Sequence, residues 1–379
     1  MQIPYTGNQT WIHDRTLLLT RHGSHAYGLA HAESDVDLKG VAIPPQRTFT
    51  GFLHPFHQVE TRQPYDMVIY GVRKFFALAA DCNPNIIEVL WTDPEDILWM
   101  TTLGEKLVKH RSLFLSQKAK HTFSGYAIAQ LKRIKSHRQW LLDPPSGPPS
   151  REAFDLPPEP EVKRDQVLTA LDMVRRKMDG WDIDLEPFER STRLELQACW
   201  AELLAEMNLT HDARWRSAAR SIGFEERFME MLERERLYRA EHKRWEQYVA
   251  WKTKRNPKRA KLERQHNIDT KHAMHLVRLM RMCREILETG HVVVKRPDRD
   301  ELLAIRHGAW SYEKLIAWAE AEDEALNAVK KASSLPKAPD RHALDALCQE
   351  IVEESFRLHG VGEVRVSQSS LEPPEPSGG

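Results

Sequence analysis

The sequence predicts an α+β fold, in which a small unit of strands with flanking helices is followed by a large, mainly α-helical domain. Over residues 1–100, short apolar and β-branched runs alternate with helical patterns. From residue 101 onward, almost every segment is rich in Leu, Ala, Glu, Lys and Arg, which favour helices. We therefore expect two domains, at 1–100 and 101–363, followed by a disordered tail at 364–379.

Four strands and two helices are expected in the first domain. Residues 15–23 are an apolar run that stops at a glycine, 38–45 are apolar and β-branched, and 57–71 contain two strand-like runs around a turn. The spacing of apolar residues predicts a helix over 72–84 that stops at an Asn-Pro pair, and a short helix over 85–91.

The second domain is expected to contain long helices separated by short connections. One connection is longer, because the prolines at 143–161 exclude a helix and predict an extended connector. The helices are expected at 102–141, 161–179, 191–206, 224–253, 267–289, 311–331 and 340–358.

The overall charge excludes a global attraction to nucleic acid or to a membrane, because Lys plus Arg and Asp plus Glu both total 55. No segment has the length of apolar sequence that a membrane span needs. The four cysteines show no C-x-x-C spacing, which argues against a zinc site or a disulfide framework. Together these features predict a cytoplasmic protein that does not contact membranes.

Two aspartates, Asp35 and Asp37, are separated by a single valine in the stretch S-D-V-D. If residues 34–40 form a strand, both side chains point to the same face. Two carboxylates held so close repel, and each has its pKa raised unless a cation lies between them. Mg²⁺ prefers such oxygen ligands. Alternatively, Ser34 and Asp35 form a turn and Asp37 is a solvated strand residue.

The pair Gly23-Ser24 lies just upstream, where an apolar strand ends and a short helix is expected to begin. A glycine allows close approach, and a serine hydroxyl and free backbone N–H groups can bind a phosphate. Such a pair next to Asp35 and Asp37 would bind a nucleoside triphosphate close to its metal ions.

The order of strand, Gly-Ser, about ten residues and Asp-x-Asp on a second strand resembles the signature of the DNA polymerase β superfamily of nucleotidyltransferases. The stretches GSHAYGLAHAESDVDLKGV and YDMVIYGVRKFFALAADCNPNIIEVLW resemble its bacterial and phage branch, the RNA-ligase-associated nucleotidyltransferases. Later stretches, FSGYAIAQLKRIKSHRQWLLDPP, KHAMHLVRLMRMCREILETG and IRHGAWSYEKL, also resemble that branch. The resemblance extends from about residue 17 to 318.

The resemblance implies that residues 1–100 are the catalytic domain, with the mixed sheet of a polymerase β-like palm. Gly23 and Ser24 would hold the β and γ phosphates of an NTP, and Asp35 and Asp37 would bind two Mg²⁺ ions, with Mn²⁺ as an alternative. The superfamily adds a third carboxylate from a neighbouring strand. Asp66 is expected in this role because it begins an apolar strand, with Glu60 as the alternative. A turn or surface role for Asp66 stays open.

Two further groups of basic residues are candidates for binding phosphates. Lys271, His275 and Arg278 occur at i, i+4 and i+7, on one face of a predicted helix, where they could bind the triphosphate or a primer phosphate. Basic residues with nearby tryptophans at 132–138 and 252–264 could bind RNA or single-stranded nucleic acid. Solvated helix faces would produce the same patterns.

These features predict an enzyme that moves an NMP from an NTP to a hydroxyl acceptor and releases pyrophosphate. An RNA or DNA 3′ end is the favoured acceptor. One alternative is a nucleotidyltransferase that modifies protein side chains, as AMPylating enzymes do. Another is a non-catalytic nucleotide-binding or RNA-binding protein, although degenerate members would be expected to lose one of Asp35 and Asp37, and both are present.

Overall fold

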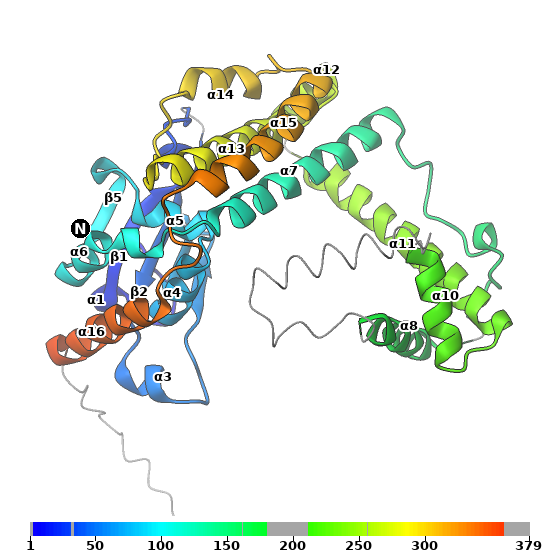
Figure 1. The fold of residues 1–379 in the computed structure, drawn as a ribbon, viewed down its shortest axis with the longest axis horizontal. Helices are drawn as coiled ribbons and strands as arrows, with labels where there is room; N and C mark the ends of the chain where they lie inside the picture. The colour runs from blue at the N-terminus through cyan, green and yellow to red at the C-terminus, as the bar shows by residue number, and fades with distance from the viewer. Residues whose placement is uncertain (1–2, 32–33, 161, 180–210, 256, 360–379) are drawn as a thin grey trace, which may run out of the picture. The chain divides into compact units, whose positions relative to one another are not determined.

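The computed structural model describes residues 3–31, 34–160, 162–179, 211–255 and 257–359. The helix expected at 191–206 and the tail expected at 364–379 lie outside these residues. The described residues confirm the predicted fold class, since a five-stranded sheet with flanking helices is followed by mostly helical chain (Figure 1).

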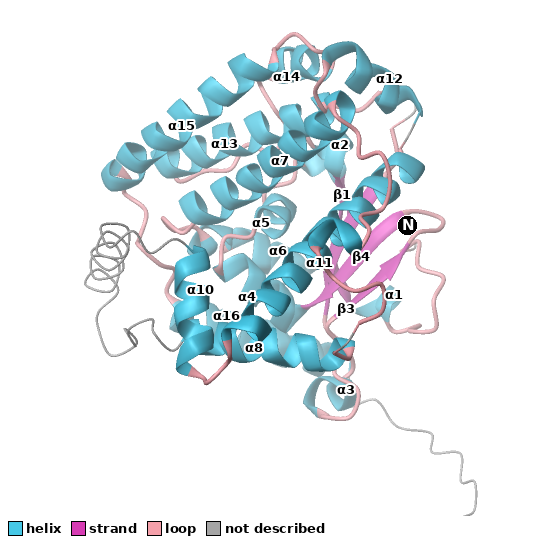
Figure 2. Ribbon diagram, turned by 90° about the vertical axis from the view of Figure 1, so that its right-hand side faces the viewer, coloured by secondary structure: helices cyan, strands magenta, loops and turns pink. Residues whose placement is uncertain are grey.

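The sheet, whose strands are magenta in Figure 2, has the strand order β3-β4-β2-β1-β5 and is mixed. Its central pair β2 and β4 is parallel, and the other pairs are antiparallel. The four expected strands are confirmed, and β5 was not expected. The strands are β1 (Thr16–His22), β2 (Asp37–Ala42), β3 (Gln58–Thr61), β4 (Asp66–Gly71) and β5 (Ile97–Met100).

The prediction of a strand over residues 34–40 is wrong at its start, because β2 begins only at Asp37. Ser34 instead closes a turn. Its backbone N–H donates to the His31 carbonyl, and its hydroxyl accepts from the His31 N–H, both at 2.9 Å. Asp35 therefore lies between a turn and the first paired residue of the strand.

The sheet is buried on both faces, and alternate residues of its strands belong to two apolar clusters. Leu19, Leu38 and Met67 pack with the N-terminal segment around Tyr5. Val41, two residues from Lys39 and four from Asp37, packs with the helices on the other face. Asp37 and Lys39 therefore belong to the helix-covered face of the sheet.

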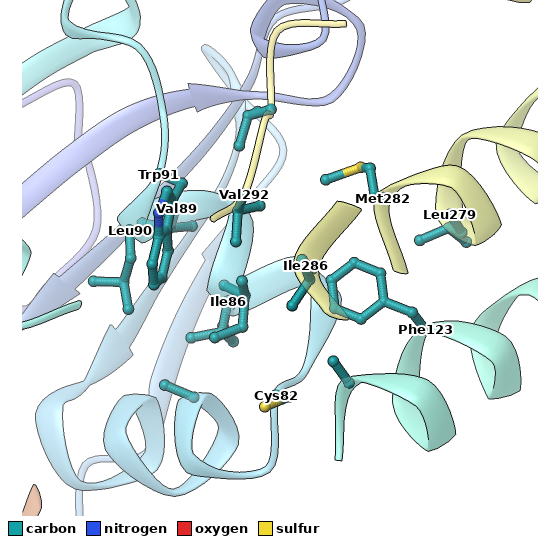
Figure 3. Packing of buried hydrophobic residues seen from close by; sticks show 14 of the residues in the cluster. Cys82, Ile86, Val89, Leu90, Trp91, Phe123, Leu279, Met282, Ile286 and Val292 are labelled. Atoms are coloured by element: carbon teal, nitrogen blue, oxygen red, sulfur yellow. The ribbon is translucent and has the colours of Figure 1, made fainter. Parts of the chain in front are cut away.

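The helices within 102–142 and 270–359 share their core with the sheet. Figure 3 shows Ile86, Phe123 and Met282, from three different helices, in one apolar cluster. The chain consequently forms one compact unit from 1–142 and 257–379, and a second from 143–256. Neither unit begins or ends at residue 100, where the domain boundary was expected.

The expected helix at 102–141 is divided into three pieces by a tertiary contact. Phe114 and Leu115 are buried between the pieces, and the backbone N–H of Gln117 donates to the Pro336 carbonyl at 2.9 Å. The Gln117 side chain donates to the Leu335 carbonyl, also at 2.9 Å. These contacts pin the chain in a non-helical conformation although its composition favours a helix.

The remaining expected helices in the described residues are confirmed to within a few residues, and α1, α3, α10, α12 and α14 were not expected. The helices are α1 (Ile12–Arg15), α2 (Gly23–Ala26), α3 (Gln46–Thr50), α4 (Val72–Ala80), α5 (Pro84–Leu90), α6 (Thr102–Lys109), α7 (Ala119–Leu142), α8 (Arg164–Asp179), α10 (His211–Ser221), α11 (Glu226–Lys254), α12 (Pro257–His266), α13 (Thr270–Thr289), α14 (Arg299–Arg306), α15 (Tyr312–Ala332) and α16 (Arg341–His359). Short 3₁₀ helices are η1 (Pro94–Asp96), η2 (Arg111–Phe114) and η3 (Glu152–Phe154).

In the residues of the second unit that the structure describes, α8, α10 and α11 form a small helical assembly. Its core includes Val174, Trp215 and Leu232. The expected connector is partly built into this unit, because Arg151 donates a hydrogen bond to the buried Glu235 of α11 at 2.5 Å. In the parts of the chain that the structure describes, we find no helix long and apolar enough to cross a bilayer.

Candidate active site

The strand register places two of the predicted carboxylates, Asp37 and Asp66, next to each other at the first residues of β2 and β4. His22, the last residue of β1, pairs with Asp37, and Asp37 pairs with Asp66 across the parallel strands β2 and β4. Paired residues of neighbouring strands point to the same face. The carboxylates of Asp37 and Asp66 therefore lie next to each other. Asp37 is half-buried, whereas Asp66 is exposed.

Gly23 follows His22 directly and packs against the Asp37 carboxylate. Its φ is +65°, and a Cβ placed on it would lie 2.3 Å from Asp37 Oδ2. Both the backbone conformation and the available space thus require glycine at this position. Ser24 is the next residue, in the single turn α2, which begins at Gly23 as the sequence predicted. Gly23, followed by Ser24, therefore lies directly beside the Asp37 carboxylate, which is in register with Asp66.

The charges of this site repel one another. The pKa of Asp37 is raised, first by burial and then by the neighbouring Asp66, with a smaller contribution from Asp35. Lys271 and Lys39 act in the opposite direction. Asp35 thus contributes to the raised pKa of Asp37 although it precedes the strand, and burial together with the two neighbouring carboxylates disfavours the ionised form of Asp37.

Glu60, the alternative third carboxylate, lies farther from Asp37. It is on the outer strand β3, where it pairs with Val68. Its side chain is exposed and accepts a hydrogen bond from the Gln58 amide. Asp66 is one strand from Asp37 and in register with it, so the geometry favours Asp66 over Glu60.

The basic residues of α13 do not act as one row. Lys271 is exposed, and its charge affects Asp37. His275 has its pKa lowered well below the usual range, mainly by burial and then by Arg278 and Lys271. Arg278 is buried, and its Nη1 pairs with Glu88 Oε1 at 2.5 Å. Lys271 is therefore placed where it could contact a phosphate. Arg278 is not, because it is buried and paired with Glu88.

Comparison with known proteins identifies the first part of the chain. Residues 7–141 match the RNA repair pathway DNA polymerase beta family. The predicted relationship to the DNA polymerase β superfamily is confirmed over this segment, which contains all three carboxylates. The match supports a nucleotidyltransferase of that superfamily with a place in RNA repair.

The other comparisons are more limited. Over 130 residues, the chain is 28% identical to an uncharacterized 38.9 kDa protein in the nrdC-mobD intergenic region of Enterobacteria phage T4. The alignment covers 31% of this chain and spans 38% of the phage protein. Residues 201–240 match the FF domain. No solved structure matches the chain.

A buried polar network centred on Glu88 joins the segment that matches the family to a later helix. Glu88 is 1% exposed and lies on α5. It accepts hydrogen bonds from Arg278 and, at 2.6 Å, from the Tyr27 hydroxyl. The Arg278 guanidinium also stacks over the Tyr27 ring, 3.7 Å from its centroid. These contacts join α2 and α5 of the polymerase β-like segment to α13.

The network continues to the face of the sheet that presents Asp37. Lys39 Nζ lies 2.9 Å from both His22 Nε2 and Asn85 Oδ1. Burial, and then the Lys39 charge, lower the pKa of His22 to about 3, so His22 is neutral and accepts the hydrogen bond from Lys39. Burial also lowers the pKa of Lys39 to about 8. The Lys39 ammonium is thus held on the same face of β2 as Asp37, whose pKa its charge lowers.

The sequence prediction missed Glu88, Tyr27, His22 and Lys39 as site-supporting residues. One signal was present, because Glu88 is the only charged residue in the apolar stretch NIIEVLW. A carboxylate in a buried helix requires a partner. Its partner is 190 positions away in the chain, and neither periodicity nor spacing reveals such a pairing.

The first basic stretch, 132–138, is only partly available to a nucleic acid. Lys132, Arg133 and Lys135 are exposed. Arg138 instead stacks over the Tyr312 ring, 4.3 Å from its centroid. His137 lies 2.9 Å from a carboxylate oxygen of Asp269. Of this stretch, only the three exposed side chains Lys132, Arg133 and Lys135 are therefore placed to contact a nucleic acid.

The second stretch, 252–264, is divided between the two compact units. Lys252 lies over the Tyr248 ring, and Arg255 lies over the Trp251 ring, 4.0 Å from its centroid. The expected aromatic partners of the basic residues are thus occupied within α11 itself. The side chains of residues 257–259 lie outside the described part of the structure.

Replacing Gly23 by Ala is expected to lower stability by about 1–2 kcal/mol, because an L-residue is strained at positive φ. It is also expected to lower the rate of nucleotidyl transfer by about 100-fold, because the new Cβ displaces the Asp37 carboxylate. Gly28→Ala is the matched control. Its φ is +69°, but its nearest contact would be Lys295 Cγ at an ordinary 3.5 Å. Equal activity of the two variants would contradict the role of Gly23.

Stability is expected to fall below pH 6.5 because of His22. Its folded-state pKa of about 3 lies below the usual 6.5, so the unfolded chain binds the proton first. Between pH 6.5 and pH 5, the free energy of unfolding should fall by up to about 1.4 kcal/mol for each unit by which the pH is lowered. Urea denaturation at four pH values would measure this slope, and His22→Gln should have a shallower one. Parallel slopes would show that His22 is not buried as a neutral group.

Proposed function

We propose that this protein is a metal-dependent nucleotidyltransferase that moves an NMP from an NTP to a hydroxyl acceptor and releases pyrophosphate. One observation supports this most directly: Asp37 and Asp66 are paired in register next to Gly23, whose missing side chain leaves room for the Asp37 carboxylate. The match of residues 7–141 to the RNA repair polymerase beta family supports the same class of reaction.

The residues of the site suit divalent metal ions. The donor atoms are the carboxylate oxygens of Asp35, Asp37 and Asp66, which are the ligands that Mg²⁺ and Mn²⁺ prefer. The raised pKa of Asp37 is consistent with a site that is completed by cations. Two bound ions would lower the pKa of the acceptor hydroxyl and neutralise charge on the departing pyrophosphate.

The protein itself would mainly position the reactants. Gly23 would let the triphosphate approach the backbone, and the Ser24 hydroxyl would donate a hydrogen bond to it. Lys271 would neutralise part of its charge from α13. Asp66 would orient the attacking hydroxyl. Lys39, held by His22 and Asn85, would limit the repulsion within the carboxylate cluster when the site is empty.

We favour an RNA 3′ end as the acceptor, with a DNA 3′ end as the next choice. The family description places its members in RNA repair. The exposed side chains of Lys132, Arg133 and Lys135 form a basic surface on α7 that could contact a nucleic-acid backbone.

Label transfer tests this proposal. The purified protein is incubated with Mg²⁺, each of the four α-labelled NTPs and, in separate reactions, RNA, single-stranded DNA or cell protein. The expected result is label on RNA, and none in a variant that combines Asp35→Ala with Asp37→Ala. Label on cell protein instead would identify a protein-modifying enzyme. Nucleotide binding without transfer to any acceptor would favour a non-catalytic binding protein.

A further inference from the structure

A second group of possible metal ligands lies between α7 and α13, which run side by side (Figures 1 and 2). His137 on α7 faces Asp269 and His272 at the start of α13. His137 Nδ1 lies 2.9 Å from Asp269 Oδ2, and His272 Nε2 lies 3.5 Å from the same oxygen. One nitrogen from each imidazole and one carboxylate oxygen all lie within 4.8 Å of one another.

The carboxylate of this cluster is oriented toward the two imidazoles by its own helix. Asp269 is the N-cap of α13, and its Oδ1 accepts a hydrogen bond from the His272 backbone N–H at 3.1 Å. This bond fixes the second oxygen, Oδ2, between the rings. The Asp269 side chain is completely buried, whereas His137 and His272 are 13% and 14% exposed. The cluster is thus enclosed on the protein side and reachable from solvent.

The imidazole of His137 is also held in place. It stacks on the Trp140 ring with a centroid distance of 5.5 Å and an interplanar angle of 27°. Trp140 is itself largely buried. Two of the three ligand groups, His137 and Asp269, are therefore positioned by surrounding contacts, as in metal sites whose outer contacts orient the ligands.

We propose that His137, Asp269 and His272 bind a transition-metal ion of the Zn²⁺ type. Two imidazole nitrogens and one carboxylate oxygen suit Zn²⁺, with water as the fourth ligand of a tetrahedron, better than they suit Mg²⁺. Bond lengths near 2.0–2.2 Å place neighbouring ligand atoms about 3.3 Å apart. The two distances to Asp269 Oδ2, 2.9 and 3.5 Å, lie on either side of this value.

The bound ion would join α7 to the first turn of α13. That turn also carries Lys271, whose charge affects Asp37. The site would therefore be structural and would fix the position of a residue at the candidate active site. It is distinct from the carboxylate cluster in both its ligands and its preferred ion, so the two sites can be tested separately.

Zinc titration of the full chain, freed of metal and competed against a chromophoric chelator, tests this proposal. We expect one tight equivalent in the wild type and in the Asp35→Ala/Asp37→Ala variant. His137→Gln and His272→Gln should each weaken binding by about 100-fold or more. His291→Gln, which replaces an exposed histidine elsewhere in the same unit, should bind as the wild type does.

Two further measurements separate ligand loss from misfolding. Asp269→Asn can still cap α13, because its amide oxygen can accept the same N–H, but it lacks the anionic ligand and should lose tight binding. At a hundredfold excess of Zn²⁺ over its Kd, Tm should rise by about 5 °C or more in the wild type and not in His137→Gln. Equal zinc affinity in the wild type and both histidine variants would overturn the proposal. So would zinc binding that requires Asp35 and Asp37.

Discussion

Replacing Asp37 by Asn is expected to lower kcat/KM for nucleotidyl transfer by at least about 100-fold. The amide keeps the size of the side chain but removes the charge that would bind a cation. The fold should tolerate the change well, because burial and Asp66 already disfavour the ionised form of Asp37. Without metal, Tm of Asp37→Asn should therefore equal or exceed that of the wild type. Loss of activity together with a lower Tm would indicate a structural role.

Asp66→Asn is expected to cause a similar loss, while Glu60→Gln should change the rate by less than about twofold. The difference follows from the sheet register, since Asp66 pairs with Asp37 and Glu60 pairs with Val68 on the far side of β4. Both variants remove one exposed carboxylate, so they form a matched pair. Loss of activity in Glu60→Gln alone would mean that the third carboxylate is assigned to the wrong strand.

Replacing Glu88 by Gln is expected to lower the free energy of unfolding by about 3–5 kcal/mol. The substitution leaves the buried Arg278 guanidinium without its anionic partner, and it weakens the acceptor for the Tyr27 hydroxyl. Urea denaturation followed by circular dichroism would measure the change. Glu350→Gln is a control, because it removes an exposed ion pair with Lys106 and should leave the free energy almost unchanged.

A double-mutant cycle distinguishes the ion pair from simple loss of packing. Arg278→Met alone should also be strongly destabilising, because it leaves Glu88 buried without its cation. In the Glu88→Gln background the same change should cost much less, since no unpaired charge remains. Additive effects would show that the two side chains contribute independently.

The parts of the candidate site that are local in the chain could be proposed from the sequence. Gly23-Ser24 and Asp35–Asp37 lie within 15 residues, and turn chemistry and residue types are enough to recognise them. Asp66 is predicted as the third carboxylate because it begins an apolar strand. A third carboxylate must lie next to Asp37, and the strand register pairs Asp66 with Asp37. Periodicity and turns predicted four of the strands along the chain, whereas their order in the sheet and the presence of β5 were not predicted.

The features that the sequence did not predict depend on contacts between distant segments. Arg278 lies on a helix that is buried on most sides, so its charge could be satisfied only internally, by Glu88. Helical spacing could not distinguish this arrangement from a solvated basic row. The interruption between α6 and α7 similarly depends on the pairing of Gln117 with residues 335 and 336. Asp35 falls outside β2 because a turn at Ser34 ends just before it.

The most direct test of the account follows the two ends of the triphosphate. NTPs labelled either at the α or at the γ phosphate are incubated with the protein, Mg²⁺ and an RNA with a free 3′ hydroxyl. Nucleotidyl transfer by Asp35, Asp37 and Asp66 predicts that the α label moves to the RNA and that the γ label leaves in pyrophosphate. Transfer of the γ label to the acceptor, or equal α-label transfer by Asp35→Ala/Asp37→Ala, would contradict it.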